Sequence, residues 1–177
     1  MSFHYQNYYF ISDYVTIASS KGQIKTLQFL QSIGRLEEKG TNNSVNEASK
    51  CGHLETVKYL LSIGKDCNEL AMDYASYHGH LDIVQLLHSL GKSCTRRAIE
   101  WASTNGHLKI IQFLNNIGKK YTDNAILWAC MFGHLNVVEY LYSIGEPITE
   151  LSINIAKQYN HQHIVYYLET ILSKMVS

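Results

Sequence analysis

The sequence of 177 residues predicts an all-α solenoid of about six stacked helix-turn-helix repeats. Three observations predict this fold. A Gly-His-Leu tripeptide recurs every 27 residues, an alanine and a leucine keep fixed distances from it, and no segment alternates between apolar and polar residues over a useful length. A single helix pair cannot bury its own apolar stripe, so stacking of the pairs provides a continuous core.

The tripeptide defines the repeat units. It begins at Gly52, Gly79, Gly106 and Gly133, with a degenerate copy at Asn160, and Gly22 precedes the first copy by 30 residues. The predicted units cover residues 11–34, 41–64, 68–91, 95–118, 122–145 and 149–172. Together with an aromatic extension at residues 1–10, they fill residues 1–177 as a single domain.

Each unit begins with a predicted first helix. Seven residues before the repeated alanine stands a residue typical of helix N-caps: Thr41, Asn68, Thr95, Thr122 and Thr149. Three residues before the alanine stands an apolar residue: Val45, Met72, Ile99, Ile126 and Ile153. The alanine is small enough to let a neighbouring helix approach closely, and its copies are Ala18, Ala48, Ala75, Ala102, Ala129 and Ala156.

A turn and a second helix complete the unit. The turn glycine is predicted to take the left-handed conformation, and Asn160 replaces it with the residue that tolerates that conformation next best. Eight residues after the turn stands a leucine: Leu30, Leu60, Leu87, Leu114, Leu141 and Leu168. A second glycine, twelve residues after the turn, is predicted to end the helix: Gly34, Gly64, Gly91, Gly118 and Gly145.

The composition excludes several classes of protein. Hydrophobic residues make up 46% and charged residues 17% of the chain, which supports a core and excludes a mainly disordered chain. Fifteen basic and fifteen acidic residues balance, which argues against nucleic acid or an anionic membrane as the partner. Residues 1–15 do not read as a secretory signal, and the longest apolar run, residues 125–132, is far shorter than the roughly twenty residues of a membrane helix. No Cys-x-x-Cys pair occurs, so we expect a cytoplasmic protein with reduced thiols.

The run from Ala102 to Leu114 resembles the second half of an ankyrin repeat, in which an alanine pair and Gly-His-Leu lead into an apolar helix. The likeness extends over residues 11–172. The unit departs from the usual ankyrin repeat of about 33 residues, and it lacks the usual Thr-Pro-Leu-His opening, since the lone proline is Pro147. The resemblance implies an ankyrin-type solenoid with β-hairpin fingers reduced or absent. Short units of this composition look most like ankyrin proteins of giant DNA viruses and certain protists.

Nine histidines raise the question of a metal site. Equivalent positions of stacked repeats lie roughly 10 Å apart, whereas zinc ligands all lie about 2 Å from the metal. The histidines that follow the turns are therefore predicted to be structural and to hydrogen-bond neighbouring turns: His53, His80, His107, His134 and His161. His78 with His80, and His161 with His163, could each offer two ligands, but neither pair has a cysteine or carboxylate at a recognised metal spacing. We therefore predict no metal and no cofactor.

Other residues that could carry chemistry have simpler interpretations. The acidic residues Glu69, Asp73, Glu100 and Asp123 are predicted to lie on a solvated helix face rather than in a catalytic cleft. Tyr59, Phe113, Tyr140 and Tyr167 share one position of the second helix and are predicted to pack between repeats. Tyr74, Trp101 and Trp128 precede the alanine and are predicted to be packing residues too. Cys67 and Cys94 are predicted to be ordinary loop thiols.

Positions that vary between units indicate a binding surface. They fall six and two residues before the alanine and two and three residues after it, and the steps of four place them on one stripe of the first helix. The resemblance implies that this stripe is concave and contacts a partner protein. We predict contacts at Tyr77, His78, Glu100, Thr104, Asn105, Leu127, Met131, Phe132, Gln158 and Tyr159.

Three functions compete on the sequence alone. The first is a non-enzymatic module that binds another protein on the concave face of the stacked first helices. The second is a self-assembling structural protein, which zero net charge and the aromatic residues Tyr5, Tyr8, Tyr9 and Phe10 favour through weak self-association. The third is a metal-dependent hydrolase built on the many histidines. No catalytic constellation is apparent, so the sequence favours the binding module.

Overall fold

The computed structural model describes residues 14–36, 43–120 and 124–176. These residues form helices and turns and contain no strand, which confirms the all-α class. The loops at residues 63–68 and 90–96 connect one helix pair to the next without a β-hairpin finger. The predicted N-caps Thr41 and Thr122, the acidic residue Asp123 and the aromatic extension at residues 1–10 lie outside the described residues.

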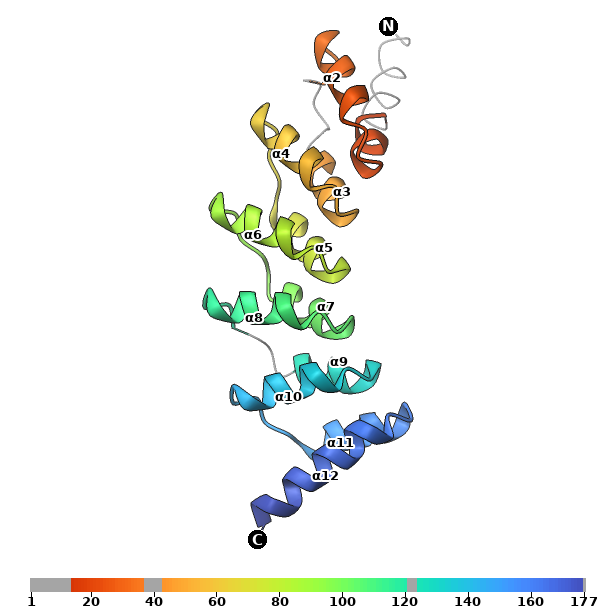
Figure 1. Ribbon diagram of the computed structural model, residues 1–177, viewed down its shortest axis with the longest axis vertical. Coiled ribbons are helices and arrows are strands. Elements are labelled where there is room, and N and C mark those ends of the chain that lie inside the picture. Colours follow the sequence, from red (N-terminus) through yellow and green to blue (C-terminus); the bar gives the residue numbers. More distant parts are fainter. Residues whose placement is uncertain (1–13, 37–42, 121–123, 177) are drawn as a thin grey trace, which may run out of the picture. The chain divides into compact units, whose positions relative to one another are not determined.

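The chain divides into two compact units, Met1–Thr95 and Arg96–Ser177. The described helices of the first unit are residues 14–20, α2 (Ile24–Ser32), α3 (Ser44–Lys50), α4 (Leu54–Ser62), α5 (Glu69–His78) and α6 (Leu81–Ser89). Those of the second unit are α7 (Arg97–Thr104), α8 (Leu108–Asn116), α9 (Asn124–Phe132), α10 (Leu135–Ser143), α11 (Glu150–Gln158) and α12 (Gln162–Val176). Within each unit the first helices lie side by side, with α3 beside α5 and α9 between α7 and α11 (Figure 1). The single domain expected over residues 1–177 stays a prediction.

The core follows the repeated positions of the sequence. The alanines are at most 2% exposed in all six repeats, and the apolar residues three positions before them are buried in every described case. The repeated leucines from Leu60 to Leu168 are fully buried, whereas Leu30 in the first repeat is only half-buried. The periodic pattern therefore identified these buried positions correctly, with Leu30 as the exception.

The turns have the predicted backbone conformation. Both glycines of each of the first five repeats have positive φ, from 65° at Gly22 to 103° at Gly145. Asn160 has φ 62° and is the one described residue other than glycine with positive φ, which confirms its role as the substitute for the turn glycine.

The predicted helix N-caps are correct in two described repeats and wrong in one. Asn68 accepts a hydrogen bond from the Leu70 amide at 3.0 Å, and Thr149 forms a capping box with Ser152. Thr95 does not flank a helix, because α7 begins at Arg97 after Arg96. The Thr95 side chain is instead held by the preceding repeat, as described below.

Overpacking of the alanine position should destabilise the second unit. Ala102 is fully buried on α7, which packs against both α8 and α9. We expect Ala102→Leu to lower the free energy of unfolding by about 1–3 kcal/mol, because added methylene groups force their neighbours off preferred rotamers. Chemical denaturation measures the change, and an unchanged midpoint would show that this position does not lie between helices.

Candidate interaction surface

Each side of a first helix has a different neighbour. The position two residues before the alanine points toward the following repeat: the Asn46 side-chain amide donates to Asn68 Oδ1 at 2.9 Å. In the next repeat, Oδ1 and Oδ2 of Asp73 accept hydrogen bonds from the Thr95 amide and hydroxyl, at 2.9 and 2.7 Å. In both repeats this position therefore bonds to a residue 22 positions further along the chain.

The prediction that Asp73 lies on a solvated face is wrong. Its exposed fraction is 0%, and that of Asn46 is 1%, so neither residue can contact a partner. The physical reason is that the carboxylate satisfies the backbone and hydroxyl donors of Thr95, which offsets the cost of its burial. Glu69, on the same helix, is exposed as predicted.

The equivalent position in α9 is apolar, and the next helix compensates for it. Leu127 can offer no acceptor to the following repeat. The start of α11 is instead capped internally, since the Thr149 amide donates to Ser152 Oγ at 3.3 Å and the Ser152 amide donates to Thr149 Oγ1 at 3.4 Å. A residue that varies between repeats can therefore reflect the needs of the fold rather than those of a partner.

The solvent-facing stripe lies one residue further along the helix. It comprises the positions five and one residue before the alanine and three residues after it, which again are spaced by four. Trp128 belongs to this stripe and is 37% exposed, although it was predicted to be a packing residue. Its ring stacks on that of Phe132, which is 48% exposed, with centroids 6.4 Å apart and planes at 29°. The spacing of four between these two aromatic residues was the signal in the sequence that could have identified the pair.

The predicted contact residues are exposed to different extents. On α5, Tyr77 is 38% exposed and His78 is exposed, and the two rings meet edge to face with centroids 4.8 Å apart. The remaining predicted contacts belong to the second unit. Half-buried among them are Glu100, Thr104, Asn105, Leu127 and Met131, and exposed are Phe132, Gln158 and Tyr159.

The structure brings the predicted residues of the second unit onto three neighbouring helices. They come from α7, α9 and α11, which pack in this order. The exposed stripe becomes more apolar toward α11, where Leu151 is 54% and Tyr159 is 44% exposed and Ile155 between them is half-buried. Trp128, Phe132, Leu151, Ile155 and Tyr159 thus form an apolar surface on α9 and α11, named here the aromatic face. Leu151 and Ile155 were not among the predicted contacts.

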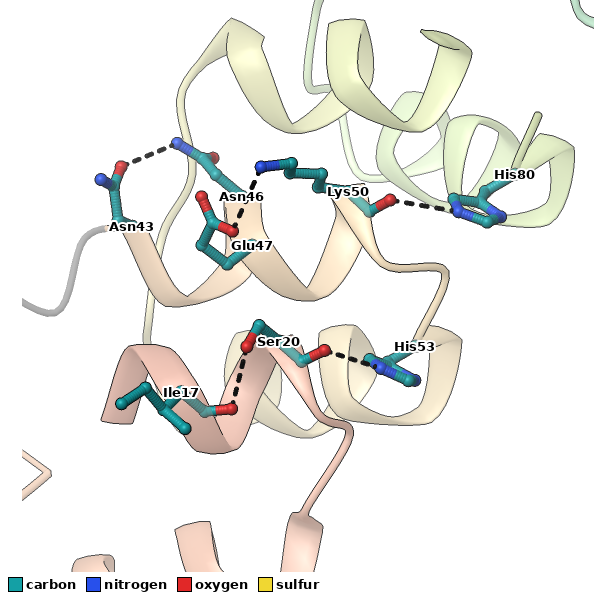
Figure 2. Close-up of polar contacts among 8 residues, drawn as sticks. All are labelled: Ile17, Ser20, Asn43, Asn46, Glu47, Lys50, His53 and His80. Carbon is teal, nitrogen blue, oxygen red and sulfur yellow. Dashed lines mark hydrogen bonds and ion pairs between the residues drawn. The ribbon is translucent and has the colours of Figure 1, made fainter. Parts of the chain in front are cut away.

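The turn histidines His53, His80, His134 and His161 have the predicted structural role. Nε2 of His53 donates to the Ser20 carbonyl at 2.9 Å, and Nε2 of His80 donates to the Lys50 carbonyl at 3.2 Å (Figure 2). In the second unit, His134 and His161 bond in the same way, each at 2.9 Å, to the carbonyl groups of Thr104 and Met131. Each acceptor stands two residues before the turn glycine of the preceding repeat. Because a carbonyl oxygen only accepts, the proton of each neutral ring lies on Nε2.

The two histidine pairs considered above as metal ligands make other contacts. The rings of His78 and His80 stack with centroids 6.2 Å apart, and Nε2 of His163 lies 3.2 Å from the Gly133 carbonyl oxygen. Among the described residues, no group of three or more His, Cys, Asp or Glu side chains could hold a metal ion.

The second-helix aromatics connect neighbouring repeats as predicted. The Tyr59 hydroxyl donates to Gln31 Oε1 at 2.6 Å, and the Asn115 amide donates to the Tyr140 hydroxyl at 3.0 Å. Both bonds reach the preceding repeat, which shows that this position of the second helix faces the repeat before it. Tyr59, Phe113, Tyr140 and Tyr167 are all half-buried.

The cysteines are free thiols of low reactivity where burial is greatest. Cys130 is buried in α9, and desolvation raises its pKa to about 12, so it remains protonated and a poor nucleophile at neutral pH. Cys67 and Cys94 lie in loops, as predicted, although Cys94 is buried.

Comparison with known proteins identifies the family. A family model described as ankyrin repeats (3 copies) matches residues 15–98 and 74–151. The chain belongs to the ankyrin repeat family. Ankyrin repeats generally act as protein–protein interaction modules and are typically non-enzymatic. A search of curated proteins found no significant match. In the described part of the chain, no helix combines the length and the apolar character that crossing a membrane requires.

Proposed function

We propose that this ankyrin repeat protein binds a partner protein through the aromatic face of its second unit. The observation that carries the proposal is the stacked pair of Trp128 and Phe132, which places two large rings in solvent on a helix whose other sides are packed. The exposure of such rings does not stabilise the fold of the second compact unit itself. Trp and Tyr are enriched among the residues that contribute most of the binding energy at interfaces.

The surroundings of the pair also support an interface. Met131 and Leu127 are half-buried beside it, and Asn124 and Gln158 are exposed polar residues on α9 and α11. An apolar centre with a polar rim is the arrangement that lets a few residues contribute most of the affinity. Because the aromatic face itself is uncharged, the partner should present apolar side chains there rather than a charged surface.

The proposed binding surface differs from the predicted set of contact residues. It uses Leu127, Met131, Phe132, Gln158 and Tyr159, and it adds Trp128, Leu151 and Ile155. Glu100 and Thr104 on α7 and its C-cap residue Asn105 are half-buried and would form the margin of the same surface. Contacts at Tyr77 and His78 stay a prediction for the first unit.

Removal of the stacked pair should abolish most of the binding. A protein retained by the wild-type chain from native cells, once purified, provides the ligand for titration. We expect Trp128→Ala with Phe132→Ala to weaken its affinity at least tenfold, because each interface anchor contributes about 1–2 kcal/mol or more. Circular dichroism and the melting temperature should stay nearly unchanged, since both side chains are substantially exposed.

Three substitutions on second helices serve as controls. Tyr166→Ala removes an aromatic residue that is 76% exposed on α12, Gln85→Ala changes an exposed position of α6, and Gln112→Ala changes a half-buried position of α8. All three should leave the affinity unchanged. A partner whose affinity falls with these controls and ignores the paired substitution would place the binding surface on the second helices and refute the proposal.

A further inference from the structure

The charged residues beside the aromatic face are unevenly distributed. Arg96 and Arg97 are exposed at the start of α7, where Glu100 is the one acidic residue of the helix. Asn124 at the start of α9 is exposed and uncharged. Glu150, at the same position as Arg96 two repeats earlier, is exposed at the start of α11. Because the three helices pack in the order α7, α9, α11, the row of helix starts changes from basic to acidic across the surface.

The basic end of this row is continuous with the aromatic positions. The guanidinium carbon of Arg97 lies 6.0 Å from the centroid of the Trp101 ring, one turn further along α7. Trp101 is half-buried and occupies the position that Trp128 occupies one repeat later. A guanidinium has five N–H donors, so its contact with a ring leaves it able to bind a carboxylate. An acidic group of a ligand can therefore bind next to the rings.

The spacing of the three first helices matches an α-helix laid across them. Packed helices lie about 8–10 Å apart. Seven residues of a helix rise about 10.5 Å and return to nearly the same face, so side chains seven residues apart can meet α7, α9 and α11 in turn. An extended chain covers the same distance in about three residues, and its side chains then point to opposite faces. The surface therefore suits a helical ligand better than a strand.

We infer that the aromatic face binds one amphipathic α-helix of a partner protein, with acidic residues at the end over α7 and basic residues at the end over α11. The inference rests on the proposed function, because it specifies the ligand of the same surface. Apolar side chains in the middle of the ligand helix pack on Trp128 and Phe132. Its acidic end pairs with Arg96 and Arg97, and its basic end, about 14 residues away, pairs with Glu150.

The charges set the direction of the ligand helix more than they set its affinity. Exposed ion pairs contribute little to binding, because water and salt screen them. Complementary charges at the rim of an interface accelerate association and disfavour wrongly placed ligands. A helix with the same charge at both ends would place one end against a like charge, so the surface selects a helix whose ends differ in sign.

A random peptide library tests this class of ligand without a known partner. Peptides of about 18 residues, long enough as helices to cross all three first helices, are displayed on phage and selected on the full-length chain. Each retained sequence is then measured against the chain with Trp128→Ala and Phe132→Ala. We expect amphipathic helices with Asp or Glu near one end, Lys or Arg about 14 residues away, and apolar residues at helical spacing between them.

Charge reversal locates the acidic end of the bound helix. We expect Arg96→Glu with Arg97→Glu to weaken the affinity of a synthetic selected peptide at least tenfold at low ionic strength, because two attractions become repulsions. Replacement of the acidic residues of the peptide by Lys should restore most of that loss. Lys109→Glu with Lys120→Glu is the matched control, since it changes the net charge equally at two exposed positions and should alter the affinity less than about twofold. Fluorescence anisotropy measures all four affinities.

A single substitution protects the test from an effect on folding. Arg96→Glu leaves the contact between Arg97 and Trp101 in place, and Arg96 is exposed, so the circular dichroism spectrum should not change. We expect this variant alone to weaken the affinity about threefold, which is roughly half of the tenfold loss on a logarithmic scale.

The outcomes separate this inference from the proposed function. Peptides that need Trp128 and Phe132 but lack the two charged ends, or that ignore the reversal of Arg96 and Arg97, would overturn the inference and leave the binding surface in place. Peptides that bind the double alanine variant as well as the wild type would overturn both. Enrichment of no peptide would overturn the inference, since an isolated helix should suffice. A dimer in light scattering that the double alanine variant converts to a monomer would identify a second copy, and not a partner helix, as the occupant.

Discussion

Replacement of Asp73 by alanine should destabilise the first unit by about 3 kcal/mol. The substitution removes two charge-assisted hydrogen bonds to Thr95, each of the class that contributes about 1.5–3 kcal/mol. It also leaves the Thr95 amide and hydroxyl without this acceptor and opens a small cavity around a fully buried position. Urea denaturation monitored by circular dichroism measures the loss.

Two further variants show whether the loss comes from the contact between repeats. Asp73→Asn keeps an oxygen for the Thr95 amide and imitates Asn46, which occupies the same position one repeat earlier, so it should cost about 1 kcal/mol or less. Asn154→Ala changes the same position in the last repeat, where the side chain is exposed, and should cost less than about 0.5 kcal/mol. Equal losses for Asp73→Ala and Asn154→Ala would mean that helix propensity, and not the bond to Thr95, decides the effect.

The repeats themselves made most of the fold predictable. A single sequence with six copies contains its own comparison, and positions that never change, such as the alanines, are those at which every repeat meets the same neighbours. The same comparison identified Asn160 as a residue in the left-handed conformation, because it stands where the other repeats have glycine. These predictions succeeded because backbone geometry and close packing depend on local residue type.

The role of positions that differ between repeats was harder to predict. Asp73 is charged and varies between repeats, and both properties suggested solvent, yet its partner Thr95 is 22 residues away and reaches the carboxylate only in the folded chain. Trp128 failed in the opposite direction, because a large aromatic residue suggests a core, whereas its place on the helix faces outward. Variation alone does not separate a surface that binds from a contact that each pair of repeats makes in its own way.

The first described repeat shows the same limit for apolar residues. Phe29 and Leu30 continue the apolar pattern of the later repeats, so their sequence gives no sign that their exposure differs. Burial depends on the neighbours that cover a residue, and the type of the residue itself does not reveal them. Only the comparison of exposed fractions across the six repeats reveals the difference.

The turn glycines and the glycines that end the second helices should differ sharply in their tolerance of a side chain. Gly52 has φ 78°, and a Cβ there would lie 2.7 Å from Nδ1 of the His80 ring, which the Lys50 carbonyl holds in place. Gly64 has a similar φ of 84°, but a Cβ there would meet nothing within 4 Å. We expect Gly64→Ala to cost about 1–2 kcal/mol for the left-handed backbone alone. Gly52→Ala should cost about 1–2 kcal/mol more, because the ring must move and lose its hydrogen bond.

A double-mutant cycle assigns that extra cost to the histidine. His80→Ala removes both the hydrogen bond and the ring that the new Cβ would meet, so a chain that carries Gly52→Ala and His80→Ala should be about 1 kcal/mol more stable than the sum of the single changes predicts. Chemical denaturation of the four proteins gives the coupling energy. If the two substitutions are additive, or if Gly52→Ala costs no more than Gly64→Ala, the ring does not restrict this position. A measured coupling would instead show that each histidine constrains the turn of the preceding repeat, which explains why glycine and histidine recur together along the chain.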